Sequence, residues 1–402
     1  MKLFQINTTV NVGSTGRIAE QIGNIAFRQG YDSYIAYGRN LNKSDNKIIR
    51  IGNSVDWKRH VLCSRLFDNH GFSSIQATKQ FLKQLEQLKP DIIHLHNIHG
   101  YYLNIELLFN YLSKAQIPVV WTLHDCWPMT GHCAHFDFVK CYKWQTGCEY
   151  CPNKRKYPAS FFHDRSKYNY YRKKELFTSI ERMVFVAPSQ WLADIVEQSF
   201  LKDYPVRIIH NGIDLSVFKP QTKTGICAKY NIGDRPFILG VANVWGQRKG
   251  LDDFILLSRL LPHNLQIVLV GLNDSQKRKL PHNIIGVNRT TNVHELAALY
   301  AETEVFVNPT WVDNFPTTNI EALACGTPVI TYRTGGSPEA ISRDTGFVVE
   351  KGDINGVYQA ILTVIKREKK QYIQPCRLQA EQKFDKEQIF QQYIRLYEQL
   401  LS

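Results

Sequence analysis

The sequence of 402 residues lacks several features that would assign it to other protein classes. It has no run of about 18 apolar residues, the length that a helix needs to span a bilayer. The first residues, from Met1 to Asn7, turn polar too soon for an export signal, so we expect a cytoplasmic protein without disulfides. The first glycine turn lacks the Gly-x-Gly-x-x-Gly pattern, and no acidic residue ends a strand near residue 37, which argues against a dinucleotide-dependent oxidoreductase.

What is present describes a globular, basic protein. Hydrophobic residues make up 44% of the chain and aromatic residues 12%, which is ordinary for a protein with a buried core. The length is enough for two domains of about 150–200 residues each. The net charge of +13 favours an anionic partner, which could be nucleic acid, an acidic membrane surface or a phosphorylated substrate. The alternative is a basic protein whose charge has no partner.

Several expected strands of the first half end in residues that could contact a ligand. A strand over Lys2–Asn7 leads into a helix through a turn that contains Gly13 and Gly16, and such turns form phosphate cradles or merely tight connections. A strand in residues 90–97 ends in His94, His96 and Asn97, and alternation sends both histidines to the same side. A strand in residues 117–125 ends in His124 and Asp125. Nothing in the sequence near His94 and His96 completes a metal site.

An unusual insert runs from Cys126 to about Tyr171 and has few aliphatic residues. It contains a Cys-x7-Cys-x6-Cys-x2-Cys pattern. A small polar loop has little apolar core, so it needs a cross-link such as a bound metal ion to stay folded. Four thiolates make a closed tetrahedral zinc site, so a structural zinc ion is expected, whereas a catalytic metal would need an open position. The alternative is a set of reduced thiols packed against Trp127, Trp144 and Tyr150. The four cysteines are Cys133, Cys141, Cys148 and Cys151.

The same insert and the residues after it are basic and aromatic. Between Lys140 and Lys174 there are ten Lys or Arg against two acids, with Tyr and Phe interleaved. Such a surface can bind nucleic acid or rest on anionic lipid headgroups with its aromatics at the interface. An exposed basic face without a partner is the alternative.

The second half carries three further candidate groups. A strand over residues 236–242 leads into a loop with Arg248 and Lys249. The stretch from Trp311 to Ile330 predicts a loop with Asp313, a short helix that carries Glu321 and ends before Gly326, and a buried strand. A second glycine turn in residues 332–339 leads into a helix, and Gly335 and Gly336 can present backbone N–H groups to phosphate.

The spacing acid-x7-acid, followed by Glu-Ala-Leu-Ala-Cys-Gly-Thr-Pro-Val, resembles the retaining glycosyltransferases of the GT-B fold, family 4. The first acid of that family is usually Glu, and here it is Asp313, one methylene shorter. The resemblance implies an α/β fold of two Rossmann-like domains facing across a cleft, with the last helix crossing back. It implies an acceptor domain over residues 1–204 with the insert at about 126–171, a donor domain over 205–385, and a returning helix over 386–402.

The resemblance also implies a role for each candidate residue. The donor is a nucleotide sugar, a UDP- or GDP-sugar, bound without a catalytic metal, because Arg248 and Lys249 neutralise its diphosphate. Glu321 holds the ribose, Asp313 contacts sugar hydroxyls, and His124 lies near the reacting sugar. The loop with Gly13 and Gly16 lies near the donor phosphates or the acceptor.

The insert resembles that of bacterial exopolysaccharide transferases, including the colanic-acid type. We therefore expect transfer of a hexosyl group, with retention, to a saccharide or polyprenyl-diphosphate-linked acceptor at the inner face of the plasma membrane. A membrane surface is then a better partner than nucleic acid. Two alternatives stay open: a nucleotide-sugar epimerase on the same fold, and a non-catalytic, zinc-stapled basic binding protein.

Overall fold

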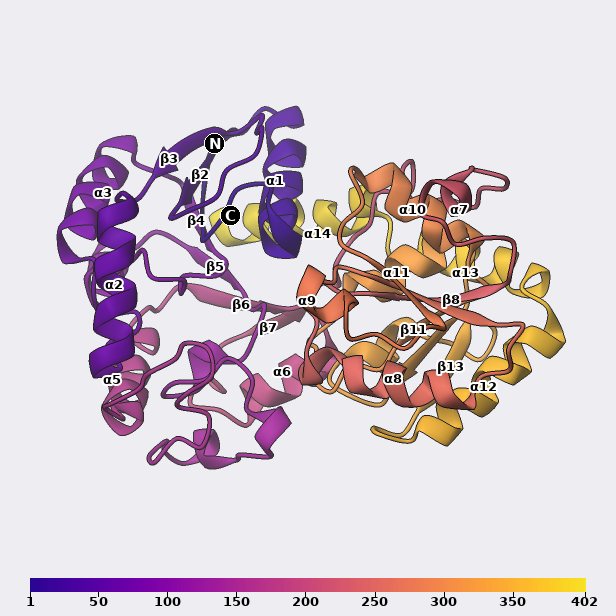
Figure 1. The fold of residues 1–402 in the computed structure, drawn as a ribbon. Helices are drawn as coiled ribbons and strands as arrows, with labels where there is room; N and C mark the ends of the chain where they lie inside the picture. Colours follow the sequence, from indigo (N-terminus) through magenta and orange to yellow (C-terminus); the bar gives the residue numbers. More distant parts are fainter. The chain divides into compact units, whose positions relative to one another are not determined.

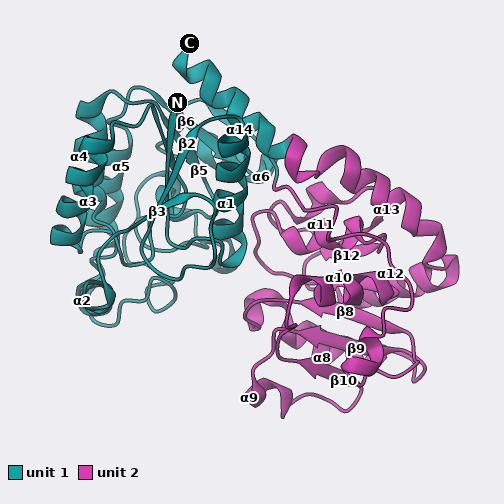
Figure 2. Cartoon of the chain, turned by 90° about the horizontal axis from the view of Figure 1, so that it is seen from above, with its two compact units in different colours: residues 1–210, 389–402 teal, residues 211–388 magenta.

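The computed structural model describes all 402 residues, which form two compact units (Figure 1, Figure 2). Unit 1 comprises Met1–His210 together with Ile389–Ser402, and unit 2 comprises Asn211–Gln388. Each unit is built on one sheet whose strands all run parallel. The prediction of an α/β protein with two Rossmann-like domains is confirmed.

The sheet of unit 1 has seven strands in the order β3-β2-β1-β4-β5-β6-β7. Strand β1 therefore lies between β2 and β4, and β5 follows β4. The central strands β4 and β5 are buried at every residue, because helices cover both faces of a parallel sheet. The strands are β1 (Lys2–Asn7), β2 (Asp32–Tyr37), β3 (Lys47–Arg50), β4 (Ile92–Leu95), β5 (Val119–Thr122), β6 (Met183–Ala187) and β7 (Val206–Ile208).

Five of the six helices in the first 210 residues, and the last helix of the chain, share buried apolar clusters with the strands of this sheet, whereas α2 does not. The C-terminal helix lies beside α1 in Figure 1, and Phe390 and Tyr393 share a buried cluster with Ile18 and Ile22. The last helix therefore returns to the first unit, as expected. The helices are α1 (Gly13–Arg28), α2 (Ser54–Phe67), α3 (Ile75–Leu88), α4 (Ile105–Ala115), α5 (Ser166–Phe177), α6 (Gln190–Glu197) and α14 (Lys386–Leu401).

The sheet of unit 2 has six strands in the order β10-β9-β8-β11-β12-β13. Strands β8, β11 and β12 are therefore neighbours at its centre. The strands are β8 (Phe237–Val241), β9 (Gln266–Val270), β10 (Ile284–Val287), β11 (Val305–Asn308), β12 (Val329–Tyr332) and β13 (Gly346–Val349). The helices are α7 (Ile226–Lys229), α8 (Leu251–Leu260), α9 (Asp274–Lys277), α10 (Val293–Glu302), α11 (Thr317–Ala324), α12 (Ile354–Arg367) and α13 (Lys370–Lys383).

Short 3-10 turns complete the structure. One of them, η5 (Ser337–Ala340), corrects the expectation of a helix after the second glycine turn. Pro338 limits the backbone hydrogen bonding there, so the segment makes a single tight turn. The others are η1 (Trp127–Met129), η2 (Asp137–Val139), η3 (Lys143–Gln145) and η4 (Gln247–Lys249). None of the helices combines the length and apolar character needed to cross a bilayer.

Candidate functional site

The candidate residues of unit 2 follow its three central strands. Arg248 and Lys249 lie in the loop after β8, Asp313 in the loop after β11, and Gly335 and Gly336 in the loop after β12. Because β8, β11 and β12 are adjacent and parallel, these loops emerge from one edge of the sheet. In open α/β sheets this edge, at the carboxyl ends of the strands, is where ligands bind.

The first two loops are joined through Lys249 and Asp313. The Nζ of Lys249 donates to Oδ2 of Asp313 in an ion pair whose side chains are 22% and 19% exposed. The neighbouring Arg248 donates from Nη1 to the carbonyl of Val312 at 3.1 Å, and its own carbonyl accepts from the N–H of Trp311 at 2.8 Å. Two cations and one carboxylate thus meet at a partly exposed position.

Glycines let these loops approach closely. A Cβ on Gly250, which has a φ of +75°, would lie 2.3 Å from the carbonyl oxygen of Pro309. A Cβ on Gly335, with φ of +52°, would lie 1.7 Å from the carbonyl oxygen of Asp313. The N–H of Gly336 donates to the carbonyl of Asn314 at 2.9 Å, so this N–H helps to hold the Asp313 loop.

Glu321 is the most buried carboxylate of this group. It lies on α11, is 6% exposed, and accepts a hydrogen bond at 3.0 Å from the hydroxyl of Tyr300. Burial raises the pKa of Tyr300, and the nearby carboxylate of Glu321 raises it further. On the same helix Asn319 is hydrogen-bonded to Asn308 and to the carbonyl of Ser337, which ties α11 to the end of β11 and to the start of η5.

In unit 1 the candidate glycines shape the turn between β1 and α1. Gly13 has a φ of +69°. A Cβ on Gly16 would lie 2.7 Å from Oγ1 of Thr9, and the N–H of Asn11 donates to the carbonyl of Gly16 at 3.1 Å. The turn is therefore tight, and glycine is required in it for steric reasons alone.

His124 follows β5 and contacts a histidine from the neighbouring strand. Its Nε2 lies 3.1 Å from Nδ1 of His96, which follows β4. His94 and His96 lie on the same side, with ring centroids 4.0 Å apart, as alternation predicted. Burial, the largest cause, lowers the pKa of His124 to about 4 and holds that of His96 well below its usual value. Both imidazoles are therefore neutral at pH 7.

Sequence reasoning missed the partners of Asp125. Its Oδ2 lies 2.8 Å from Nε2 of His99, and Nδ1 of His99 lies 2.8 Å from the hydroxyl of Tyr157. Burial acts to raise the pKa of Asp125, but the charge and hydrogen bond of His99 outweigh it and lower the pKa. The position of His99 just beyond β4 was a usable signal, whereas nothing in the sequence placed Tyr157 of the insert beside it.

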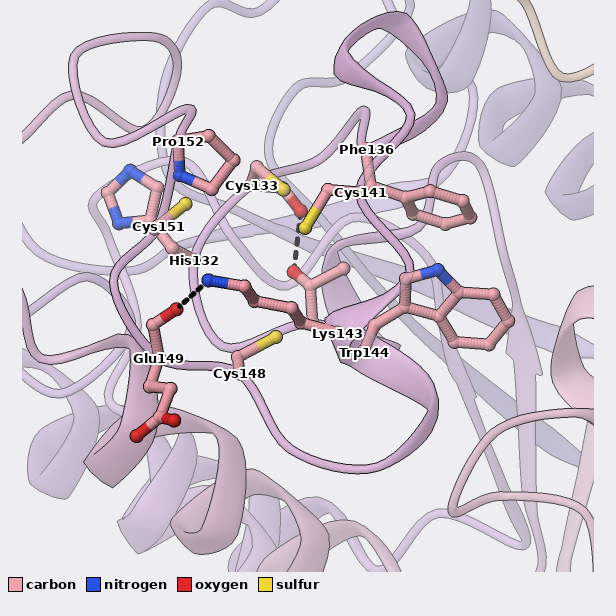
Figure 3. A pocket seen from close by; sticks show the side chains of 11 residues that line it. His132, Cys133, Phe136, Cys141, Lys143, Trp144, Cys148, Glu149, Cys151 and Pro152 are labelled. Carbon is pink, nitrogen blue, oxygen red and sulfur yellow. Dashed lines mark hydrogen bonds between the residues drawn. The ribbon is translucent and has the colours of Figure 1, made fainter.

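The four cysteines of the insert line one pocket (Figure 3). Cys148 accepts a hydrogen bond from the N–H of Gly131 at 3.2 Å, and a hydrogen bond between Cys133 and Cys151 is the largest cause that raises the pKa of Cys151. No group of three or more His, Cys, Asp or Glu side chains in the chain is arranged to hold a metal ion. The cysteines thus share a pocket, but their thiols do not form a ready cluster.

The basic and aromatic segment proves partly buried. Tyr150 and Phe162 are 81% and 70% exposed, and most of the interleaved aromatics lie on the surface. Lys173 on α5, in contrast, is 1% exposed and donates from Nζ to the carbonyls of Trp127 and Thr130 at 2.8 and 3.1 Å. Tyr170 is also buried. These two side chains anchor the insert and do not contribute to its surface.

Comparisons with known proteins match both units to one enzyme class. Residues 20–217 match the family described as Glycosyltransferase Family 4, and residues 235–367 match Glycosyl transferases group 1. An Escherichia coli protein named as a colanic acid biosynthesis glycosyl transferase, WcaC, is 24% identical over 88% of this chain and 88% of its own length. A Campylobacter jejuni protein named as an N,N'-diacetylbacillosaminyl-diphospho-undecaprenol alpha-1,3-N-acetylgalactosaminyltransferase is 25% identical over 56% of this chain and 62% of its own length.

Solved structures of the same fold cover nearly the whole chain. Sucrose-phosphate synthase from Thermosynechococcus elongatus superposes with a TM-score of 0.73 at 19% identity, over 99% of this chain and 98% of that chain. Anabaena HepE in complex with UDP-glucose superposes with a TM-score of 0.68 at 15% identity, over 99% of this chain and 100% of that chain. These similarities show the fold, which is GT-B.

Proposed function

We propose that this chain, which belongs to the glycosyltransferases, transfers a hexosyl group from a nucleotide sugar to a saccharide or lipid-linked saccharide acceptor in polysaccharide synthesis. The relatives named for colanic acid synthesis and for transfer to a diphospho-undecaprenol saccharide support this substrate class. The residues of the donor site lie in unit 2, and His124 lies in unit 1.

The meeting of Arg248, Lys249 and Asp313 at the carboxyl ends of β8 and β11 is the observation that carries the proposal. When the glycosidic bond to a nucleotide sugar breaks, negative charge grows on the departing diphosphate. Two cations held in place before the reaction stabilise that charge without reorganising. Asp313 holds the ammonium of Lys249 in position, and its carboxylate is itself an acceptor for sugar hydroxyls.

Glu321 is proposed to hold the ribose of the donor. A carboxylate can accept hydrogen bonds from two neighbouring hydroxyls. The hydroxyl of Tyr300 donates to Oε2 of Glu321 and so holds this carboxylate in place. The glycine turn at Gly335 and Gly336 then serves to place the Asp313 loop, and the turn at Gly13 and Gly16 keeps the start of α1 close to the loop that follows β1. The HepE complexes with UDP and UDP-glucose support a nucleotide-sugar donor.

Two finer features belong to the same proposal. The anomeric configuration is retained, as the resemblance to family 4 implies. The reaction needs no catalytic metal, because Arg248 and Lys249 supply the positive charge beside the diphosphate. NMR of the product identifies its anomer, and turnover in buffer without Mg²⁺ or Mn²⁺ tests the second point.

The test of the function is a screen of UDP- and GDP-sugars for nucleotide release, with and without saccharide and lipid-linked acceptors. Release that depends on the acceptor supports transfer. Interconversion of the free sugar nucleotides would instead identify an epimerase. Binding without either reaction, for every donor, would favour a non-catalytic binding protein.

We also propose that the four cysteines of the insert bind one structural zinc ion. They line a single pocket, and a Cβ on Gly131 would lie 2.0 Å from the carbonyl oxygen of Ser166 and 2.8 Å from the Cβ of Cys148, so only glycine fits at this position beside the pocket. Backbone N–H groups commonly donate to ligating thiolates, as Gly131 does to Cys148. Because the thiols are not gathered for a metal, binding requires them to turn about their Cα–Cβ bonds.

The exposed aromatics of the insert are proposed to contact an anionic membrane surface. Phe161 and Phe162 are 49% and 70% exposed, and they follow the cations Lys154, Arg155 and Lys156 in the sequence. Aromatic rings at the headgroup level and cations near anionic lipid act together in such contacts. This surface would bring the enzyme to a lipid-linked acceptor.

A further inference from the structure

Gln5, in the middle of β1, has a fixed amide orientation. It is fully buried, and its Nε2 donates to the carbonyl of Ala19 at 2.9 Å. A carbonyl can only accept, so the nitrogen must face Ala19 and the oxygen must face the other way. That oxygen, Oε1, lies 3.0 Å from Nε2 of His96.

The amide oxygen of Gln5 sets the protonation of His96. Because Oε1 only accepts, Nε2 of His96 must carry the proton. His96 is 1% exposed, and burial holds its pKa well below the usual value, so the ring is neutral and has only one N–H. Its Nδ1 is therefore an acceptor.

The same argument extends one step further, to His124. Its Nε2 lies 3.1 Å from Nδ1 of His96, which accepts, so Nε2 of His124 must donate. His124 is also neutral, because burial lowers its pKa to about 4. Its Nδ1 is then unprotonated. The side chain is partly exposed and no group of the chain bonds to Nδ1.

The geometry assigns Gln5 and His96 as positioning residues that fix His124 in its Nε2–H tautomer, so that Nδ1 accepts a hydrogen bond from a hydroxyl of a bound sugar. The assignment of the sugar rests on the proposed function, whereas the tautomer does not. A hydroxyl can donate to Nδ1, but a carboxylate or a dianionic phosphate cannot. A sugar hydroxyl is therefore a group that Nδ1 of His124 can bind, whereas the diphosphate of the donor is not.

The tautomer is measured on the whole protein labelled with ¹⁵N-histidine, by correlating ring nitrogens with carbon-bound ring protons at pH 7. The signal of His124 is assigned by its loss in His124→Asn. We expect a protonated Nε2 and an unprotonated Nδ1. A His124 ring that is charged, or protonated at Nδ1, would overturn the inference.

Gln5→Leu removes the acceptor while keeping a buried side chain of similar size. His96 can then move its proton to Nδ1, so the His124 signal should shift toward the Nδ1–H tautomer. Gln266→Leu is the matched control, because Gln266 is also a buried strand glutamine that donates to a backbone carbonyl, but in unit 2. An unchanged His124 signal in folded Gln5→Leu contradicts the relay.

Activity adds a second measurement, made with the donor and acceptor found in the screen. His96→Leu should lower kcat/KM about tenfold, the loss of one hydrogen bond to the reacting complex. His96→Asn keeps an oxygen where Nδ1 stood and should recover most of that loss. Equal losses in both variants would assign His96 to packing alone. The NMR spectra need no substrate. The assignment of the tautomer can therefore be refuted independently of the proposed transfer reaction.

Discussion

Lys249 and Asp313 form an ion pair between the loops that follow two adjacent strands, β8 and β11. The pair holds a cation at the edge of the sheet where a donor diphosphate is proposed to bind. An ion pair at this exposure contributes little to folding, about 1 kcal/mol or less. We therefore expect that breaking this ion pair lowers the rate of transfer much more than it lowers the stability of the fold.

Lys249→Ala should lower kcat by about 10²–10³, the usual cost of removing one group that stabilises developing charge. The melting temperature should change little. Lys229→Ala is the control, because it breaks another ion pair of unit 2, that of Lys229 with Glu295. Turnover that stays at the parent level in folded Lys249→Ala would remove the diphosphate role.

Gly335→Ala should destabilise unit 2 and abolish turnover, because the new Cβ would lie 1.7 Å from the carbonyl oxygen of Asp313. Gly233→Ala separates this clash from backbone strain, since Gly233 has a φ of +72° and open space around its Cβ position. The control should lose only about 1 kcal/mol. Urea unfolding measures both, and equal losses in the two variants would contradict the close approach at Gly335.

Stability should fall as the pH drops below 6.5. Burial lowers the pKa of His60 to about 3 and that of His124 to about 4, and it holds those of His94 and His96 well below 6.5. These rings take up protons only on unfolding, so the stability present above pH 6.5 is lost toward pH 4. Each contributes a slope of up to about 1.4 kcal/mol per pH unit.

Urea unfolding between pH 7.5 and 5 checks this pH dependence. His60→Gln should flatten the slope, because the amide can still accept the hydrogen bond that Nε2 of His60 receives from Gly71 but does not titrate. His132 has the opposite effect on the pH dependence of stability. Burial acts to lower its pKa, but the hydrogen bond with Asp68 outweighs burial and raises it, and this is one residue against four. A denaturation midpoint that is constant over this range would refute the prediction.

Purified protein should contain about one zinc ion per chain by elemental analysis if the insert is stapled by metal. Cys148→Ser should lose it, and Cys63→Ser on α2 should keep it, because Cys63 lies outside the pocket. If the parent protein contains no metal when it is purified without a chelator, the zinc proposal is wrong and the pocket holds four reduced thiols.

Membrane contact should depend on the exposed aromatics. Phe161→Ser combined with Phe162→Ser should weaken sedimentation with vesicles rich in phosphatidylglycerol by about tenfold. Phe27→Ser removes an aromatic that is 59% exposed on α1 and serves as the control. Equal binding of all three proteins, or equal binding to uncharged vesicles, would exclude this surface as the contact.

Most strands could be located from the sequence, because strands of a parallel sheet are buried on both faces and therefore appear as short apolar runs. Strand β1 has the bounds that the pattern predicted, and helix α11 carries Glu321 and ends before Gly326 as expected. Helix α4 was missed although Asn104 caps it with a side-chain hydrogen bond to Leu107. Helix α5 was missed because its sequence is polar and basic, and its buried face includes Lys173.

The candidate residues that follow strands could be predicted from the sequence, whereas the contacts between residues of separate strands could not. Arg248, Lys249 and Asp313 were found from spacing and resemblance, and the structure brings them together. The contact of Gln5 with His96 depends on the pairing of β1 with β4, which spacing along the chain does not reveal. The same holds for Tyr157, which reaches His99 from an insert without regular structure.

Helix α14 adds Phe390, Tyr393 and Tyr397 to the buried core of unit 1. During synthesis, therefore, the unit that leaves the ribosome first cannot complete its interior until residues 386–401 emerge. Unit 2 has all of its own segments before that moment, so it is positioned to mature earlier although it is translated later.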